Sequence, residues 1–180
     1  MNRKNKLIIG LLGIGLLLFC TIQFWIIPTN NARDAEYAKN QTEALTHDIR
    51  AIEEYRSAYI GNASNIVGLF ENLPLCDISK KYEIDSENCI LTVNYLDTVW
   101  NIGEEKVQRA LIYSSVAAMA AIDNLSDINY SFSGAEYSFT RKQIEEIYGT
   151  PLSRLLSQES RNEELRNRLN DINFIGRFFD

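Results

Sequence analysis

The stretch A-L-I-Y-S-S-V-A-A-M-A-A-I, residues 110–122, decides the fold of this chain. It is apolar over only 13 residues, whereas a helix that crosses a bilayer needs about 20. Asn101 followed by Glu104 resembles a helix N-terminus, so we expect a helix from there to about Leu125. Its Ala and Ser side chains are small and would allow a sheet to approach closely. The stretch therefore predicts a central core helix.

Two strands are expected before this helix. Residues 82–85 and 89–96 are short and partly alternating, and the turn formers Ser86, Glu87 and Asn88 separate them. The alternation is clearest at Ile90 and Thr92. We therefore predict two neighbouring strands that are joined by a short turn.

A hairpin is expected after the helix, in Y-S-F-S-G-A-E-Y-S-F, residues 130–139. With Ser133–Glu136 as the loop, antiparallel pairing places Phe132 opposite Tyr137 and Tyr130 opposite Phe139. All these rings would then share one face of the sheet. Packing under the Ala-rich helix is the simplest use of such a face.

A loop and a short helix precede the first strand. Gly61 permits a tight turn, and Asn62 or Ser64 can cap the helix that runs to Pro74. Capping alone explains these polar residues. The alternative is that the loop holds a ligand with its backbone N–H groups and the Asn62 amide.

Helices are also expected towards the C-terminus. Thr140 and Gln143 form a capping box, and Gly149 suits a left-handed helix end, after which Thr150-Pro151 begins another short helix. Ser160 and Glu163 repeat the capping box for a last helix over residues 161–172. The aromatic tail F-I-G-R-F-F-D, residues 174–180, either docks on the domain or contacts a partner. Together these patterns predict an α+β fold, with an antiparallel sheet of about four strands packed against the Ala-rich helix.

The N-terminal part predicts a membrane anchor. Residues 7–27 carry no charge, and as a helix they would be about 30 Å long, the thickness of a bilayer core. A cleaved signal peptide would have a shorter apolar region with small residues behind it. A lipoprotein would carry a small residue before Cys20, where this chain has Phe19. The uncleaved anchor fits best.

The charges around the anchor predict its orientation. Arg3, Lys4 and Lys6 precede it without an acidic residue, which favours a cytoplasmic N-terminus. We therefore expect a domain outside the cytoplasm, on a cell membrane that the chain crosses once. The predicted parts are a cytoplasmic end (1–6), a transmembrane anchor (7–27), a stalk with an amphipathic helix (28–58) and an extracytoplasmic domain (59–180).

The stalk helix is expected over residues 35–59, because Leu45, Ile49, Ile52 and Tyr59 recur at helical spacing. Its apolar stripe either packs on the domain or pairs with a second copy of the chain. His47, the only histidine, is expected to be a solvated side chain, since no other Cys or His stands at a metal-ligand spacing.

The outer part is acidic. Without the three N-terminal cations it holds 15 basic and 24 acidic residues, a net charge of −9. Such a surface repels phosphate backbones, so nucleic acid is excluded as a partner. Cys76 and Cys89 lie in the predicted oxidising compartment. They either form a disulfide or remain two partly buried thiols.

The sequence offers no catalytic constellation. It contains none of the phosphate-binding, dinucleotide-binding, serine-hydrolase or zinc-protease motifs. The carboxylate pairs Glu104-Glu105 and Glu145-Glu146 are adjacent on helices and point apart. We therefore expect no enzyme, no catalytic or metal-binding residue and no cofactor.

Several motifs resemble a known family, the bacterial domain of unknown function 4825. They are Y-I-G-N-A-S (59–64), L-P (73–74), I-D-N-L (122–125), and Y-S-F-T-R with I-E-E-I-Y-G within residues 137–149. The resemblance covers about residues 55–150. Its recurrent residues correspond to Tyr59, Gly61, Asn62, Ser64, Asn124, Tyr137, Phe139, Arg141, Tyr148 and Gly149.

The resemblance implies a small extracytoplasmic domain, mainly of Gram-positive bacteria, that is tethered to membranes and sometimes attached to membrane regulators. It implies no known reaction. Arg141 directly follows the aromatic strand, and its guanidinium either holds a carboxylate or phosphate of a ligand or pairs with Glu145 one turn on. The candidate binding residues are Tyr59, Asn62, Ser64, Tyr137, Arg141 and Tyr148.

The expected function is binding or sensing of an envelope protein or a small ligand, reported through the membrane segment. The alternative is a structural or interaction subunit of a cell-envelope assembly. In that case the stalk helix or the C-terminal aromatic residues would make the contacts, including self-association.

Overall fold

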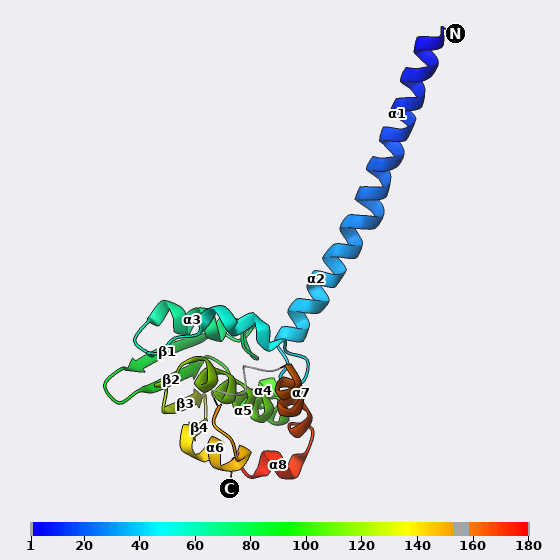
Figure 1. The fold of residues 1–180 in the computed structure, drawn as a ribbon. Helices are drawn as coiled ribbons and strands as arrows, with labels where there is room; N and C mark the ends of the chain where they lie inside the picture. Colours follow the sequence, from blue (N-terminus) through cyan, green and yellow to red (C-terminus); the bar gives the residue numbers. More distant parts are fainter. Residues whose placement is uncertain (1, 153–158, 180) are drawn as a thin grey trace. The chain divides into compact units, whose positions relative to one another are not determined.

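The computed structural model of the chain describes residues 2–152 and 159–179. The chain divides into two compact units, which meet between Lys39 and Asn40. The first unit is helical from Arg3 onwards (Figure 1). Its helix is made of α1 (Arg3–Thr21), a π-helical turn (Ile22–Ile26) and most of α2 (Ile27–Gln41).

The first unit contains a helix that is long and apolar enough to cross a membrane. The candidate span is Gly10–Gln41; its most apolar window has a mean hydropathy of 2.2, and none of that window is buried in the protein. A helix with these properties is compatible with membrane anchoring.

The prediction of an amphipathic helix that reaches Tyr59 is wrong. The helix ends at Gln41, and after a turn the chain forms a 3-10 helix, η2 (Ile49–Tyr55), which the Asp48 side chain caps by accepting from the Arg50 N–H at 3.1 Å. Ile49 and Ile52 are buried in the core of the second unit. One unbroken helix to Tyr59 could not bury Ile49 and Ile52 in this core, because the chain must turn after Gln41 for these side chains to pack there.

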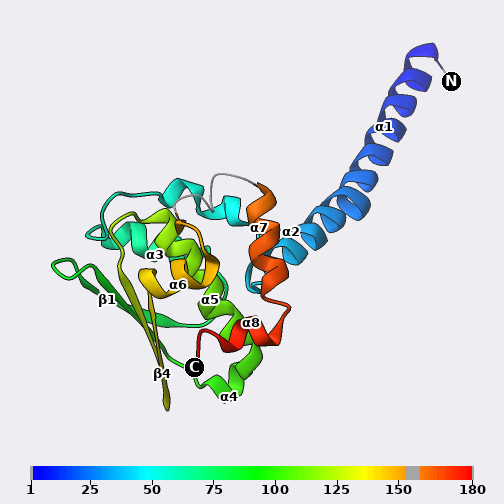
Figure 2. The same ribbon diagram turned by 60° about the horizontal axis from the view of Figure 1, so that its bottom comes forward.

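The second unit holds all the strands of the described chain. Figures 1 and 2 show a sheet with α3, α5, α6 and α8 on one side of it. The elements are α3 (Ala63–Glu71), β1 (Lys80–Asp85), β2 (Ile90–Tyr95), α4 (Val99–Ile102), α5 (Glu104–Ala121), β3 (Asp127–Phe132), β4 (Ala135–Thr140), α6 (Arg141–Tyr148), α7 (Glu159–Arg168) and α8 (Ile172–Gly176).

The predicted α+β class is confirmed, and one detail of the sheet is corrected. The strands lie in the order β1-β2-β3-β4, and β2 pairs with β3 in parallel, whereas the outer pairs are antiparallel. A fully antiparallel sheet had been expected. The parallel pair arises because α4 and α5 carry the chain from the end of β2 back to the level where β2 began.

The predicted hairpin is present with a different register. Tyr130 pairs with Tyr137 and Phe132 with Ala135, so the loop is the two-residue turn at Ser133 and Gly134. Gly134 has a φ of 91°, which a glycine adopts without strain and which a tight hairpin turn requires. The shift is by two residues, so the aromatic face is preserved. Its use as core is confirmed, since Tyr130, Phe132 and Phe139 are buried.

Helix α5 is the predicted core helix. It begins at Glu104 and ends at Ala121, and every residue from Ala110 to Ala121 is buried. The expected start at Asn101 instead belongs to the separate short helix α4, which Thr98 caps and which ends at Gly103. Gly103 has a φ of 100°, so the backbone turns between α4 and α5.

The C-terminal tail docks on the domain, as one of the two sequence interpretations predicted. Phe174 and Phe178 are buried, and the Phe178 ring contacts the rings of Phe139 and Tyr148. The predicted last helix, 161–172, corresponds to α7 but ends at Arg168. A separate helix, α8, follows, and the Asp171 side chain caps it by accepting from the Asn173 N–H. The short helix expected after Pro151 lies outside the described residues, apart from Leu152.

Candidate ligand-binding site

An open hollow of about 720 Å³ lies where β4 runs into α6. The start of β3 contributes Ser126 and Asp127 to its wall, and the end of α6 contributes Gly149. The remaining lining residues are Thr140, Arg141, Lys142, Glu145, Glu146, Thr150 and Pro151.

Local sequence signals position the α6 side of this hollow. Thr140 Oγ1 accepts from the Gln143 N–H at 3.1 Å, as the predicted cap requires. Gly149 has a φ of 70°, and its N–H donates to the Glu145 carbonyl oxygen at 2.8 Å. This left-handed glycine ends the helix as predicted and turns the following chain along the hollow.

Arg141 has a structural position that neither sequence interpretation foresaw. Its Nε donates to the Leu125 carbonyl oxygen at 3.0 Å, and its Nη2 donates to the carbonyl oxygens of Met119 and Ile122 at 2.7 and 2.8 Å. These are carbonyl groups at and beyond the C-terminal end of α5. A guanidinium is suited to this position, because helix C-termini leave carbonyl groups unpaired and carry partial negative charge.

Glu145 is also used within the fold. Its Oε1 accepts from the Leu152 N–H at 3.0 Å, which holds the chain that follows α6. Burial lowers the pKa of the Arg141 guanidinium, and the carboxylates of Glu145 and Asp123 act in the opposite direction. The acid predicted to pair with Arg141 therefore acts on it through charge and hydrogen-bonds elsewhere.

The rim of the hollow carries charges of both signs. Lys142 Nζ lies 4.0 Å from Glu146 Oε1, and both side chains are mainly exposed. Asp127 is the first residue of β3, and its Oδ2 is 2.5 Å from Ser126 Oγ. The rim therefore offers an ammonium group and carboxylates to a polar molecule.

A second group of predicted residues lies beside the C-terminal end of α5, which Arg141 also contacts. The Ser57 N–H donates to the Ala121 carbonyl oxygen at 2.9 Å, and the Ile60 N–H donates to Asn124 Oδ1 at 2.8 Å. These bonds attach the loop before α3 to the end of α5. Tyr59 on this loop is 73% exposed, so its ring is accessible.

Asn62 and Ser64 belong to the cap of α3. Asn62 Oδ1 accepts from the Asn65 N–H at 3.2 Å, which is the capping role that the sequence predicted. Ser64 lies exposed in the first turn of the helix. A role for either residue in binding a ligand stays a prediction.

Tyr137 and Tyr148 lie in a different place. Tyr137 contacts the rings of Phe132 and Phe179, and Tyr148 contacts Phe174 and Phe178. These rings belong to the aromatic core under the C-terminal helices. The structure therefore places Arg141 and the loop of Tyr59 at the end of α5, Asn62 and Ser64 at the start of α3, and Tyr137 and Tyr148 among the aromatic rings.

Asn124 was noted only as a recurrent family residue, yet it joins three segments. Its Oδ1 accepts from the Ile60 N–H, and its Nδ2 donates to Cys89 Sγ at 3.3 Å. The feature of the sequence that could have identified Asn124 is its position directly after the Ala-rich helix. A polar residue at the end of a buried helix often bonds neighbouring loops.

Cys76 and Cys89 are free thiols in the structure, the second of the two alternatives. Cys76 precedes β1 and Cys89 is the last residue of the β1–β2 turn, so the length of β1 lies between them in the chain. Burial raises the pKa of the Cys76 thiol. Within the described residues, no group of three or more His, Cys, Asp or Glu side chains could hold a metal ion.

Comparison with known protein families shows which family the chain belongs to. The family described as "Domain of unknown function (DUF4825)" matches residues 52–142, just over half of the chain. The chain belongs to the DUF4825 family. No curated protein and no solved structure matches it significantly. The DUF4825 segment runs from η2 through β4 to the start of α6, and Lys142 is its last residue.

Proposed function

We propose that this DUF4825 protein is a membrane-anchored binding module that recognises a small polar ligand outside the cytoplasm and reports its presence through the N-terminal helix. The observation that carries this proposal is the open hollow beside α6. Its rim presents the ammonium group of Lys142 and the carboxylates of Asp127 and Glu146. Groups of both signs are suited to a zwitterionic molecule, such as an amino acid or a short peptide with free termini.

The proposed ligand is bound and not converted. The titratable groups of the rim are one ammonium and several carboxylates on a solvent-open surface, and Glu145 is occupied by the Leu152 N–H. Acid–base catalysis needs titratable groups that converge on a reacting atom within hydrogen-bonding distance. We therefore propose a non-enzymatic role without a cofactor.

The proposed location follows from charge. Arg3 and Lys4 precede the apolar helix, and cations prefer the cytoplasmic side of a membrane span. An impermeant maleimide tests this on intact bacteria that carry Lys81→Cys, since Lys81 is exposed on β1. Rapid labelling is expected. Labelling only after lysis would place the domain in the cytoplasm.

The binding proposal is tested on the full-length protein in detergent micelles. Thermal unfolding is measured with a panel of free amino acids and dipeptides, and at least one should raise the midpoint. Lys142→Ala and Glu146→Gln should each abolish that rise, whereas Lys81→Ala on β1 should retain it. Arg141→Ala is unsuitable here, because Arg141 hydrogen-bonds the end of α5. If the ligand still raised the unfolding midpoint of both rim variants, the ligand would bind elsewhere on the protein.

A second candidate function is an interaction subunit of an envelope assembly. Trp100 is 92% exposed and Leu96 is 61% exposed, on the segment that leads from β2 into α4. Exposed large apolar side chains that lie together are typical of protein contacts. A photo-crosslinking amino acid at position 100 would test this in cells. Crosslinks to one abundant protein would favour assembly, whereas a lack of crosslinks would favour the ligand-binding proposal.

A further inference from the structure

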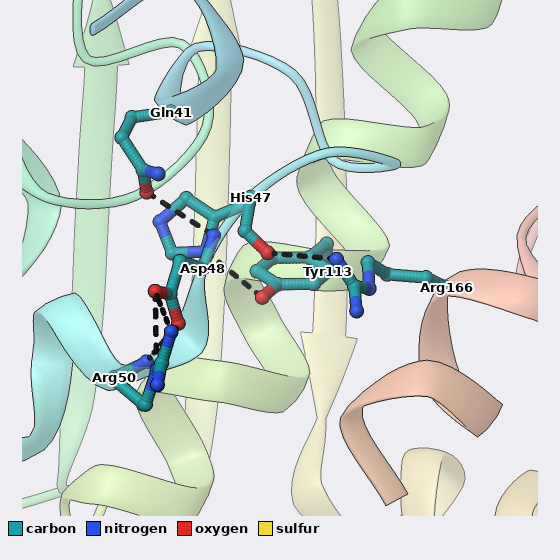
Figure 3. Close-up of polar contacts among 6 residues, drawn as sticks. All are labelled: Gln41, His47, Asp48, Arg50, Tyr113 and Arg166. Carbon is teal, nitrogen blue, oxygen red and sulfur yellow. Dashed lines mark hydrogen bonds and ion pairs between the residues drawn. The ribbon is translucent and has the colours of Figure 1, made fainter. Parts of the chain in front are cut away.

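The only histidine of the chain is fully buried, although the sequence had predicted a solvated side chain. His47 lies on the segment that joins α2 to η2. Its Nδ1 lies 2.9 Å from the Tyr113 hydroxyl (Figure 3), and its Nε2 lies 2.7 Å from the Asn72 carbonyl oxygen. A carbonyl oxygen only accepts, so Nε2 carries the proton and Nδ1 accepts the hydrogen bond from Tyr113.

This arrangement requires a neutral imidazole. Protonation would place a second N–H at Nδ1, opposite the hydroxyl that now donates to it. It would also place a positive charge at a site with no solvent exposure. Burial lowers the pKa of His47 from 6.5 to about 4, against the raising effect of the Asn72 carbonyl.

Burial outweighs the effect of the charged groups around His47 and keeps the neutral form favoured. Asp48, its neighbour in the chain, raises the pKa of His47, and Arg166 on α7 lowers it. Arg50 pairs with Asp48 at 2.8 Å and lowers the pKa of that carboxyl group. From α5, Tyr113 presents its hydroxyl and an edge-on ring whose centroid is 5.0 Å from that of the imidazole.

His47 also connects the end of α2 to the domain. The Asp48 N–H donates to Gln41 Oε1 at 3.2 Å (Figure 3), and the His47 N–H donates to the Glu43 carbonyl oxygen at 3.0 Å. Residues 40–48, here called the connecting segment, thus form a compact turn. The His47 ring attaches this turn to α5 and to the residue that follows α3.

We propose that His47 is an acid-sensitive latch, which holds the connecting segment on the domain while it is neutral and releases the segment when it is protonated. The hydrogen bond from the Tyr113 hydroxyl requires an unprotonated Nδ1, and the fully buried ring has no solvent exposure to stabilise a positive charge. The chain leads from the connecting segment directly into α2 and the apolar helix. Release would therefore loosen the domain from the membrane helix. This inference does not depend on the ligand proposed above.

The test uses the full-length protein in detergent micelles, purified without a histidine tag. Because the chain has one histidine, a single imidazole NMR signal reports its titration. We expect a midpoint near 4 instead of 6.5. Amide hydrogen exchange of residues 42–48, corrected for the intrinsic pH effect, should accelerate up to about tenfold per pH unit as the pH falls from 6.5 towards 4.

Two substitutions distinguish release of the connecting segment by His47 from a general sensitivity of the protein to acid. His47→Gln retains an amide donor and acceptor but does not titrate, so exchange of the connecting segment should become nearly independent of pH. Tyr113→Phe removes the hydroxyl that donates to Nδ1 and should accelerate exchange already at neutral pH. Tyr130→Phe is the matched control. It removes another buried hydroxyl, which bonds Ser115 at 3.0 Å, and should leave the His47 titration unchanged.

Two outcomes would overturn the proposal, and neither requires a variant that folds. One is a His47 midpoint near 6.5 in the wild-type protein. The other is exchange that accelerates in α5 and the sheet together with the connecting segment, which would mean global unfolding instead of local release.

Discussion

Nη2 of Arg141 donates a hydrogen bond to the carbonyl oxygen of Met119 at 2.7 Å, so the first residue of α6 is joined to the end of the core helix α5. Two further carbonyl groups, those of Ile122 and Leu125, accept from the same guanidinium. In the sequence, Arg141 was the candidate cation for binding a ligand. In the structure, its hydrogen bonds attach α6 to the end of α5 and so stabilise the fold. Its position on the hollow's wall is a consequence of that role.

Arg141→Lys should destabilise the domain by about 2–3 kcal/mol, because an ammonium cannot reproduce the forked geometry and buried carbonyl groups would lose their donors. Urea unfolding followed by circular dichroism measures this. Lys142→Met is the matched control, since that neighbouring side chain is 87% exposed, and it should change stability by less than about 0.5 kcal/mol. Equal midpoints for Arg141→Lys and the wild type would show that the three hydrogen bonds contribute little.

Gly68→Ala should destabilise α3, although replacing a glycine inside a helix usually stabilises it by about 1 kcal/mol. A Cβ at this position would meet the Tyr55 ring closer than van der Waals contact allows. That ring is held in place, because the Tyr55 hydroxyl accepts from Asn72 Nδ2 at 3.1 Å. Thermal unfolding should show a net loss of about 1 kcal/mol. In a Tyr55→Ala background the same change should become neutral or stabilising, and an unchanged cost there would refute the steric explanation.

Phe178→Ala should cost about 3 kcal/mol, because it removes a buried ring that packs on Phe139, Tyr148 and Phe174. Ile172→Ala is the control on the same tail, since Ile172 is 61% exposed and should tolerate the change. Deleting the tail should therefore unfold or aggregate the domain. A truncated protein that remains as stable as the full chain would contradict the docked position of the tail.

The free energy of unfolding should fall as the pH is lowered from 6.5 to about 4, by up to about 3 kcal/mol from His47. In the folded state the pKa of His47 is lowered, so the unfolded state binds the proton first and is favoured across this range. Above pH 6.5 the contribution is complete, and below about 4 it no longer changes. Urea titrations at several pH values measure the slope. His47→Gln should flatten it, and an identical slope in that variant would assign the effect to other groups.

Much of the fold follows from local pattern. The Ala-rich stretch of α5 is too short for a membrane and too apolar for a surface, so burial was its expected place, and α5 is buried from Ala110 onwards. Thr140 and Gly149 bound α6 as predicted, because capping depends on a side chain and a φ angle within one turn. The hairpin face was also predictable, since a register error of two residues preserves the face.

The positions of single polar side chains were not predictable in this way. His47 was expected in water, and Arg141 was expected to hold a ligand or Glu145. Their actual partners are Tyr113 and Met119, which are 66 and 22 residues distant in the chain. Sequence spacing contains no information on such contacts, because they arise only when α5 has been placed on the sheet.

The sequence by itself determined the strands and most of the helices, which faces are apolar and where a membrane span can form, because these depend on periodicity and on residues within a few positions of one another. The tertiary structure alone decided that β2 and β3 run parallel, that the helix after the span ends at Gln41, and that the only histidine is buried. Each of these depends on burial shared between distant segments, and the free energy of that burial outweighs local preference.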